Sequence, residues 1–210
     1  MANTSKIRGF IPVKHVTGAP YTGQANIYAV AASDATAIFI GDPVKITSDG
    51  NAQGIQIVTK ATAGAAILGI CVGIINPKFD PVAGGMSSGS VLLDTPQYRA
   101  ASTAQYILVA DSPDLLFEVE AVTGSNSAYA FSVADIGLNA DLSTVAGSTT
   151  TGTSAAALDM ATKAVTATLQ FKIMGVVQRP DNEITGNNTK VLVKFNNAQL
   201  SSGTGTLGIA

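Results

Sequence analysis

A serine between glycines is the first place in this sequence where residue type and spacing could support covalent catalysis. The segment Gly85-Met86-Ser87-Ser88-Gly89 fits the G-x-S-x-G pattern of a nucleophilic serine on a tight turn. That chemistry needs a strand before the serine, a helix after it and a later histidine to accept the proton. The chain continues instead into the strand-like Val91-Leu92-Leu93, and the only histidine, His15, precedes the serine. We therefore interpret this segment as a glycine-rich loop.

The sequence contains few residues that could bind a metal or act as a reactive thiol. A protein metal site needs three or four ligands, and this chain offers one histidine, His15, and one cysteine, Cys71. Cys71 lies in the apolar run 67–75, which predicts a buried, unreactive side chain. A single cysteine forms no internal disulfide, so the fold does not require an oxidising compartment. We expect no metal and no other cofactor.

Glu118 and Glu120 are the only carboxylates whose spacing suggests a pair. They flank Val119 and so share one face of an expected strand. Two like charges on one strand face are typical of a surface that is open to solvent, and we predict that here. With no catalytic group beyond these, the sequence predicts a protein that is not an enzyme.

The composition argues against several classes of binding partner. Only 12% of the residues are charged, about half the usual share. The 12 Lys and Arg are scattered and the net charge is −2, which argues against nucleic-acid binding. The most apolar stretch, 64–75, is too short to span a bilayer, and residues 1–11 lack the apolar core of a secretory signal. A neutral polar surface of this kind suits packing against other subunits.

The elements that must position these residues are strands. Short runs rich in β-branched and aromatic residues recur between Gly, Pro, Asn and Asp turns, and several alternate apolar with polar side chains. The expected strands are 28–30, 37–40, 44–46, 55–58, 67–75, 105–109, 115–119, 166–173 and 191–195. The pattern predicts an antiparallel β-barrel or sandwich with an extended N-terminal arm and very little helix. Asp49-Gly50 indicates a hairpin, and 132–138 and 154–161 are the best helix candidates.

Composition shifts divide the chain into three parts. We expect an arm over 1–29, a β-barrel domain over 30–197 with a low-complexity loop near 139–157, and a flexible tail over 198–210. Ile67-Leu68-Gly69-Ile70-Cys71-Val72 has a weak echo in Ile173-Met174-Gly175-Val176-Val177. Two strands of one barrel that each need a glycine at a bend would explain it without a duplication.

Candidate contact residues gather in the arm. Pro20, Tyr21, Gln24 and Asn26 combine a rigid turn, an amphipathic ring and two amides, a set that can anchor a partner without charge. The same residues could instead close one end of a barrel.

Two further groups are candidates. Tyr98 and Arg99 could pair across a subunit interface, although Arg99 could equally satisfy a turn carboxylate such as Asp111. We expect the Thr-rich loop 145–154 to project outward or toward a neighbour.

The sequence resembles head-associated structural proteins of tailed bacteriophages, of the kind that act as capsid cement or decoration proteins. The resemblance covers most of 7–120 and, more loosely, the C-terminal strands. It rests on Gly9-Phe10-Ile11-Pro12-Val13, 18–26, 33–37, Gly41-Asp42-Pro43-Val44, Ile67-Leu68-Gly69, Tyr98-Arg99 and 109–118.

The resemblance implies a β-barrel protein that assembles as a homotrimer. It would be made in the host bacterial cytoplasm and bind the outer capsid surface of the virion. Its partner would be the major capsid protein, which it would brace against internal DNA pressure. Two alternatives stay open: a minor virion protein of the tail, baseplate or head fibre, and a carbohydrate- or cell-surface-binding β-module. The lack of Trp and the 6% aromatic content count against the module.

Overall fold

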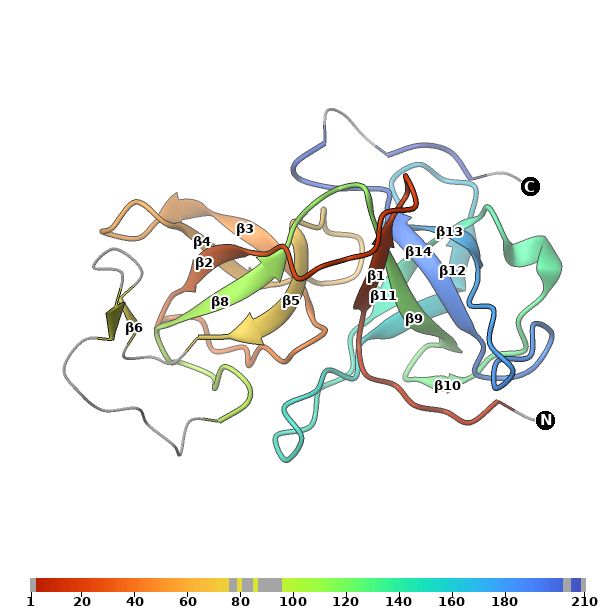
Figure 1. The fold of residues 1–210 in the computed structure, drawn as a ribbon, viewed down its shortest axis with the longest axis horizontal. Coiled ribbons are helices and arrows are strands. Elements are labelled where there is room, and N and C mark those ends of the chain that lie inside the picture. Colours follow the sequence, from red (N-terminus) through yellow and green to blue (C-terminus); the bar gives the residue numbers. More distant parts are fainter. Residues whose placement is uncertain (1–2, 76–78, 81–84, 87–95, 202–204, 209–210) are drawn as a thin grey trace.

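Two closed sheets lie side by side in the computed structural model of this chain (Figure 1). The structure describes residues 3–75, 79–80, 85–86, 96–201 and 205–208. Across these residues it is mainly β, and the one helix is the short 3-10 turn Val133–Asp135 within the predicted 132–138. The predicted fold class is thus confirmed, but the strands build two barrels where the sequence suggested a single barrel or sandwich.

The first barrel closes in the order β2-β4-β3-β5-β8. Its strands are β2 (Asn26–Val30), β3 (Pro43–Gly50), β4 (Gln56–Lys60), β5 (Gly69–Ile74) and β8 (Gln105–Ala110). Val44, Val58 and Val109 are fully buried inside it because alternate side chains of a strand point to the same face. A hairpin joins β3 to β4 as predicted, but its turn lies at 51–55, and Asp49-Gly50 are the last residues of β3. A two-stranded ribbon, β6 (Phe79–Asp80) with β7 (Gly85–Met86), lies between β5 and β8 in the chain.

The second barrel is built on the long strand β9. Its strands are β9 (Leu115–Thr123), β11 (Asn139–Ser143), β12 (Ala157–Ala164), β13 (Phe171–Val176) and β14 (Lys190–Phe195), with β1 (Ile11–His15) and β10 (Ser127–Ala128) added along β9. Pairing of β14 with β9 closes the ring. Phe117, Phe171 and Phe195 fill its centre, and Phe10 stacks on Phe171 with ring centroids 4.4 Å apart.

The two barrels repeat one topology in one register. In each barrel, the first strand along the chain pairs in parallel with the third strand and antiparallel with the last. In the first barrel β2 pairs with β4 and β8 in this way, and in the second barrel β9 pairs with β12 and β14. The strand pairs match residue by residue: Ile46 opposite Val58 corresponds to Leu142 opposite Leu158. Pro43 opposite Ile70 corresponds to Asn139 opposite Lys172. The chain therefore contains a structural repeat.

The weak sequence echo falls on equivalent strands of this repeat. The register shifts between Cys71 and Gly73 in β5, and between Ile173 and Gly175 in β13, as in a β-bulge. Of the two glycines that the echo aligns, Gly175 lies at its bulge, but Gly69 pairs regularly with Val44, and the counterpart of Gly175 is Gly73. The echo is therefore shifted from the structural register, and its two strands lie in different barrels. Our interpretation of the echo as two strands of one barrel was wrong.

A buried carboxylate joins the barrels. Asp42, at the start of β3, accepts hydrogen bonds from the backbone N–H of Phe39 (2.9 Å) and the hydroxyl of Ser154 (2.5 Å), and pairs with the Lys60 ammonium at 3.0 Å. Ser154 precedes β12, so this contact links the two repeats. Gln170 adds a second link by donating to the carbonyls of Thr62 and Ala65. A buried charge with these partners is fully compensated.

The predicted N-terminal arm differs from the structure. Residues 11–15 and 26–30 are strands, and Phe10 is buried in the second barrel at 1% exposure. Asn3 donates to the Glu183 carbonyl and the Thr189 hydroxyl. The sequence pattern missed this because β1 is five residues long and contains Pro12, which weakens any strand signal.

Three other boundaries also differ. Residues predicted as a flexible tail are hydrogen-bonded: Ala198 forms a bridge with Ile67 of the first barrel, and Thr206 N–H donates to the side chain of Asn196. The predicted loop near 139–157 begins with the fully buried strand β11. The helix expected at 154–161 is largely strand β12, because tertiary pairing overrides the helix propensity of its alanines.

Candidate functional site

A bridging segment, residues 12–27, crosses from the second barrel to the first over the outside of the molecule (Figure 1). It starts in β1, ends in β2 and contains the predicted contact residues of the arm. A hairpin orders its first half: His15 N–H donates to the Ala19 carbonyl, and Tyr21 N–H to the Val13 carbonyl. Pro20 is exposed and bridges to Lys14. The segment is therefore shaped by this chain alone.

Tyr21 and Gln24 set the second half of the bridging segment. The Tyr21 hydroxyl donates to the Gln24 carbonyl at 3.0 Å, and its ring packs against the core of the second barrel. This partial burial raises the pKa of Tyr21, so the hydroxyl stays a donor. The exposed Gln24 side chain bonds to Thr22, through its oxygen to the N–H and through its nitrogen to the hydroxyl.

Asn26 and Asp111 fix the start of β2. The Asn26 amide donates to both carboxylate oxygens of Asp111 at 3.1 and 2.8 Å, and the Tyr28 hydroxyl donates to the same carboxylate at 2.7 Å. Burial and the neighbouring Asp111 charge raise the pKa of Tyr28. The Asp111 carboxylate is therefore bound by Asn26 and Tyr28, and it does not pair with Arg99, which the sequence suggested as a possible partner.

Exposed apolar side chains accompany these amides. Val13, Val16 and Ile27 are 39%, 46% and 37% exposed along the bridging segment. Lys14 and His15 are the only side chains in the segment that can carry charge, apart from tyrosine. This surface offers apolar and amide contacts with little charge to desolvate, which is typical of the core of a protein interface.

Tyr98 and Arg99 lie elsewhere and play different parts. Arg99 is fully buried and donates to the backbone carbonyls of Ala31, Thr36 and Thr103 at 2.6–2.8 Å, with Asp34 at 4.0 Å. Burial lowers the pKa of Arg99. Tyr98 stacks on Phe39 with centroids 4.9 Å apart. The structure therefore buries Arg99 among the loops 31–36 and 99–103 of the first barrel, which it holds together.

The Thr-rich loop is anchored at its base and projects at its tip. The Ile40 N–H donates to the Gly152 carbonyl, and the Ser154 N–H donates to the Ile40 carbonyl. The base of the loop is therefore hydrogen-bonded to the first barrel. Residues 148–151 are exposed, and the loop extends away from both barrels (Figure 1).

Glu118 and Glu120 were predicted to face solvent, and that prediction is wrong. They are 9% and 4% exposed, beneath the chain that leads into β1. Arg179 binds Glu118 with two hydrogen bonds of 2.8 and 2.9 Å, while Glu120 accepts from the Ser5 hydroxyl and the Lys6 N–H. The covering groups come from distant parts of the chain, so the local pattern could not reveal them.

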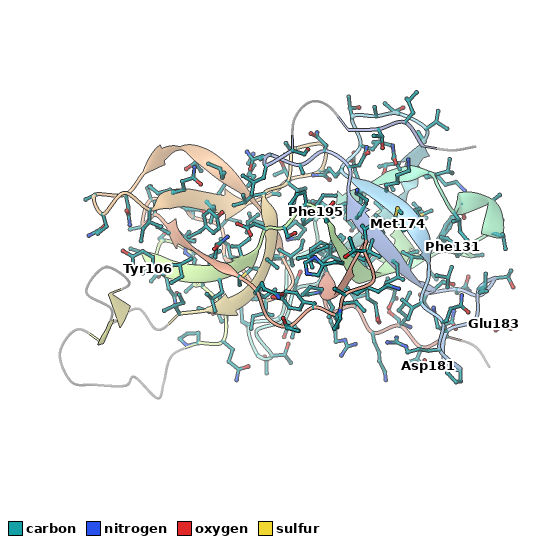
Figure 2. All side chains as sticks on the ribbon, turned by 45° about the horizontal axis from the view of Figure 1, so that its top comes forward. Tyr106, Phe131, Met174, Asp181, Glu183 and Phe195 are labelled. Carbon is teal, nitrogen blue, oxygen red and sulfur yellow. The ribbon has the colours of Figure 1, made fainter. Side chains whose placement is uncertain are left out.

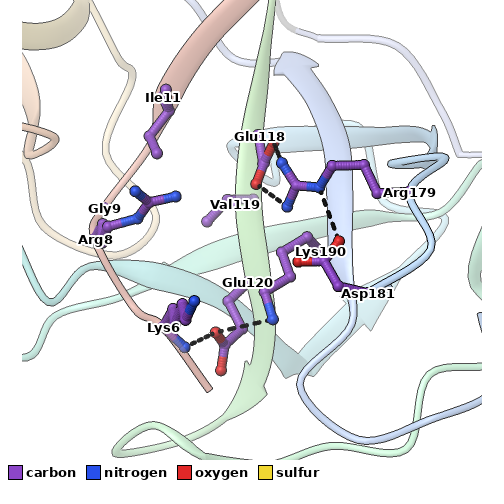
Figure 3. A pocket seen from close by; sticks show the side chains of 10 residues that line it. All are labelled: Lys6, Arg8, Gly9, Ile11, Glu118, Val119, Glu120, Arg179, Asp181 and Lys190. Carbon is purple, nitrogen blue, oxygen red and sulfur yellow. Dashed lines mark hydrogen bonds and ion pairs between the residues drawn. The ribbon is translucent and has the colours of Figure 1, made fainter. Parts of the chain in front are cut away.

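These carboxylates line a cleft of about 270 Å³ (Figure 3). Arg179 also reaches Asp181 at 3.3 Å, and Lys190 lies 4.0 Å from Glu120 while donating to the Thr4 carbonyl. Hydrogen bonding to Glu118 raises the pKa of Arg179, so the guanidinium stays charged. Asp181, which lines the cleft, and Glu183 lie near each other on the second barrel (Figure 2). The three carboxylates of the cleft are thus bound by groups of the same chain, while Arg8 also lines the cleft and has no ion pair among the described residues.

Three further observations concern metal ligands, membrane-spanning helices and the two candidate nucleophiles, Ser87 and Cys71. Within the described residues no group of three or more His, Cys, Asp or Glu could hold a metal, and no helix there is long and apolar enough to cross a membrane. Ser87 lies outside the described residues. Cys71 is fully buried, and burial, followed by the nearby Asp42 charge, raises the pKa of its thiol to about 12.

Comparison with known proteins identifies no relative: no family model, curated protein or solved structure matches this chain.

Proposed function

We propose that this protein is a capsid decoration protein of a tailed bacteriophage, which binds the outer head surface and bridges neighbouring capsid subunits. The observation that supports it best is the bridging segment, which presents exposed valines, Ile27 and uncharged amides in a shape that the chain itself maintains. The sequence resemblance described above points to the same class. In this proposal the protein is not an enzyme, and its partners are the major capsid protein and further copies of itself.

The mechanism is burial of surface. Each contact removes apolar and amide groups from water and raises the free energy needed to separate two capsid subunits. The two barrels are joined through Asp42 and Ser154, so a load on one barrel passes to the other. In a homotrimer, several interfaces of modest size would act together and give avidity without tight single-site affinity.

Sedimentation of purified protein with isolated phage heads tests the proposal. We expect saturable binding that approaches one copy per major capsid protein, and the same ratio by quantitative mass spectrometry of virions. A variant with Val13→Glu and Val16→Glu should lose binding, whereas Val133→Glu, which changes an exposed valine on the second barrel, should not. A few copies per virion would place the protein in the tail, baseplate or head fibre. Absence from virions would overturn the proposal.

A further inference from the structure

The structural repeat reveals an unoccupied position in the first barrel. In the second barrel, Glu118 of β9 pairs with Leu192 on one side and with Ile11 of β1 on the other. The equivalent residue of the first barrel is Ile27, since it pairs with Leu108, the counterpart of Leu192. Within the part of the chain that the structure describes, no strand occupies the other side of Ile27.

The free side is the edge next to residues 24–27. On that side β4 meets β2 only at Ala29, so the start of β2 extends past its neighbour. Gln24 and Asn26 are exposed, and Ile27 is exposed by 37%. An uncovered strand edge presents backbone N–H and C=O groups that can pair with an added strand.

Strand β1 shows what such a position accepts. It lies antiparallel on the equivalent edge of β9, and its sequence Ile-Pro-Val-Lys-His is apolar with a basic end. Asp111 follows β8, so it lies on the opposite side of β2 from the free edge, where Asn26 and Tyr28 hold its carboxylate. The edge therefore favours an extended segment like β1, with apolar side chains that can pack against the exposed Ile27.

We propose that the edge at 24–27 binds an extended segment of a capsid subunit as an added antiparallel strand, in the position that β1 fills in the second barrel. This inference rests on the proposed function and names its mode of binding. Backbone pairing would provide affinity, and the exposed side chain of Ile27 would select apolar residues of the segment.

Hydrogen exchange of the full chain, free and bound to purified heads, tests this directly. We expect the amides of 24–27 to exchange more slowly on heads, whereas those of 115–118 stay unchanged because β1 already covers them. Ile27→Lys places a charge on the edge and should weaken head binding about tenfold or more, equivalent to about 1.4 kcal/mol. Val133→Lys is the matched control.

The outcomes separate the two proposals. If the wild type binds heads but 24–27 exchange at the free rate, or Ile27→Lys binds as the wild type does, strand addition is overturned and the decoration function stands. If the wild type binds no heads, the decoration function itself fails. The exchange measurement does not depend on a variant, so misfolding of Ile27→Lys would leave the test intact.

Discussion

Gly73 and Gly175 occupy the same bulge in the two barrels, opposite the equivalent residues Leu108 and Leu192. The backbone around each bulge repeats as well. Gly41 and Gly137 donate to the carbonyls of Cys71 and Ile173 at 2.7 and 2.9 Å. Their φ angles are 95° and 94°, in the left-handed region that favours glycine. The repeat thus extends from strand order to individual backbone angles.

Gly41→Ala and Gly137→Ala should both destabilise the protein. Each forces a Cβ into a left-handed conformation, at a cost of about 1–3 kcal/mol. Gly41→Ala should be the more severe, because its Cβ would lie 2.6 Å from the Arg8 carbonyl oxygen. Urea unfolding measures both. Gly175→Ala is the control, since its Cβ would meet nothing within 4 Å, and a loss there equal to that of Gly137→Ala would contradict the argument.

Phe10→Ala should unfold the second barrel more readily. It removes a ring that is 1% exposed and stacked on Phe171, which costs about 3–5 kcal/mol in a core. Val16→Ala, at an exposed position, should change the free energy of unfolding by less than about 0.5 kcal/mol. Equal effects of the two substitutions in denaturant titrations would show that residues 3–15 are an independent arm after all.

Lys163→Met should lower stability in a pH-dependent way. Lys163 donates to Asp135 and Tyr129, each at 2.6 Å. These bonds raise the pKa of Lys163, and although burial acts to raise the pKa of Asp135, its hydrogen bonds hold it below the ordinary value. The contribution should therefore be present between about pH 4 and pH 10. It should fade as acid protonates Asp135 and as base deprotonates Lys163.

The size of that contribution is modest. Lys163 is 37% exposed, so solvent screens the pair and we expect about 1 kcal/mol or less. Thermal unfolding of Lys163→Met against the wild type across this pH range gives the difference. The control is Lys14→Met, an exposed lysine for which the described residues hold no ion pair. A difference for Lys163→Met that persists unchanged below pH 3 would rule out Asp135 as its source.

Cys71 should be inert in the folded protein. Its thiol is fully buried and has a pKa of about 12, so almost no reactive thiolate exists at pH 8. Ellman's reagent should detect no thiol until denaturant is added, and one thiol thereafter. Ser148→Cys, on the exposed tip of the Thr-rich loop, should add one rapidly reacting thiol. Fast reaction of the native wild type would mean that the first barrel opens readily.

Local pattern predicted much of the strand content. Alternating apolar residues located β8 and β14 to within a few residues, because burial of one face imposes a period of two. The strand β9 is buried on both faces, and its apolar and aromatic residues located it instead. The same logic could not show that the strands close into two rings, since strands of both barrels have the same period. It also missed β1, whose five residues become a strand only when β9 is present.

Long-range partners account for the remaining differences. Arg99 and Glu118 carry charges that a local pattern assigns to the surface, yet both are buried because carbonyls or a guanidinium from remote segments satisfy them. Among the predicted contact residues, Pro20, Tyr21, Gln24 and Asn26 do lie together on one segment. The free edge beside Ile27 became visible only through comparison of the barrels.

The N-terminal residues contact the barrel that the chain builds last, and a C-terminal residue contacts the barrel that it builds first, which affects both synthesis and mechanical load. Residues 3–15 belong to the second barrel, and Ala198 returns to Ile67 of the first. A nascent chain can therefore close its first ring early, but its leading residues must wait for β9 before they find their place. Because residues 3–15 and 205–208 are both held on the second barrel, tension applied between the two ends would load that barrel first.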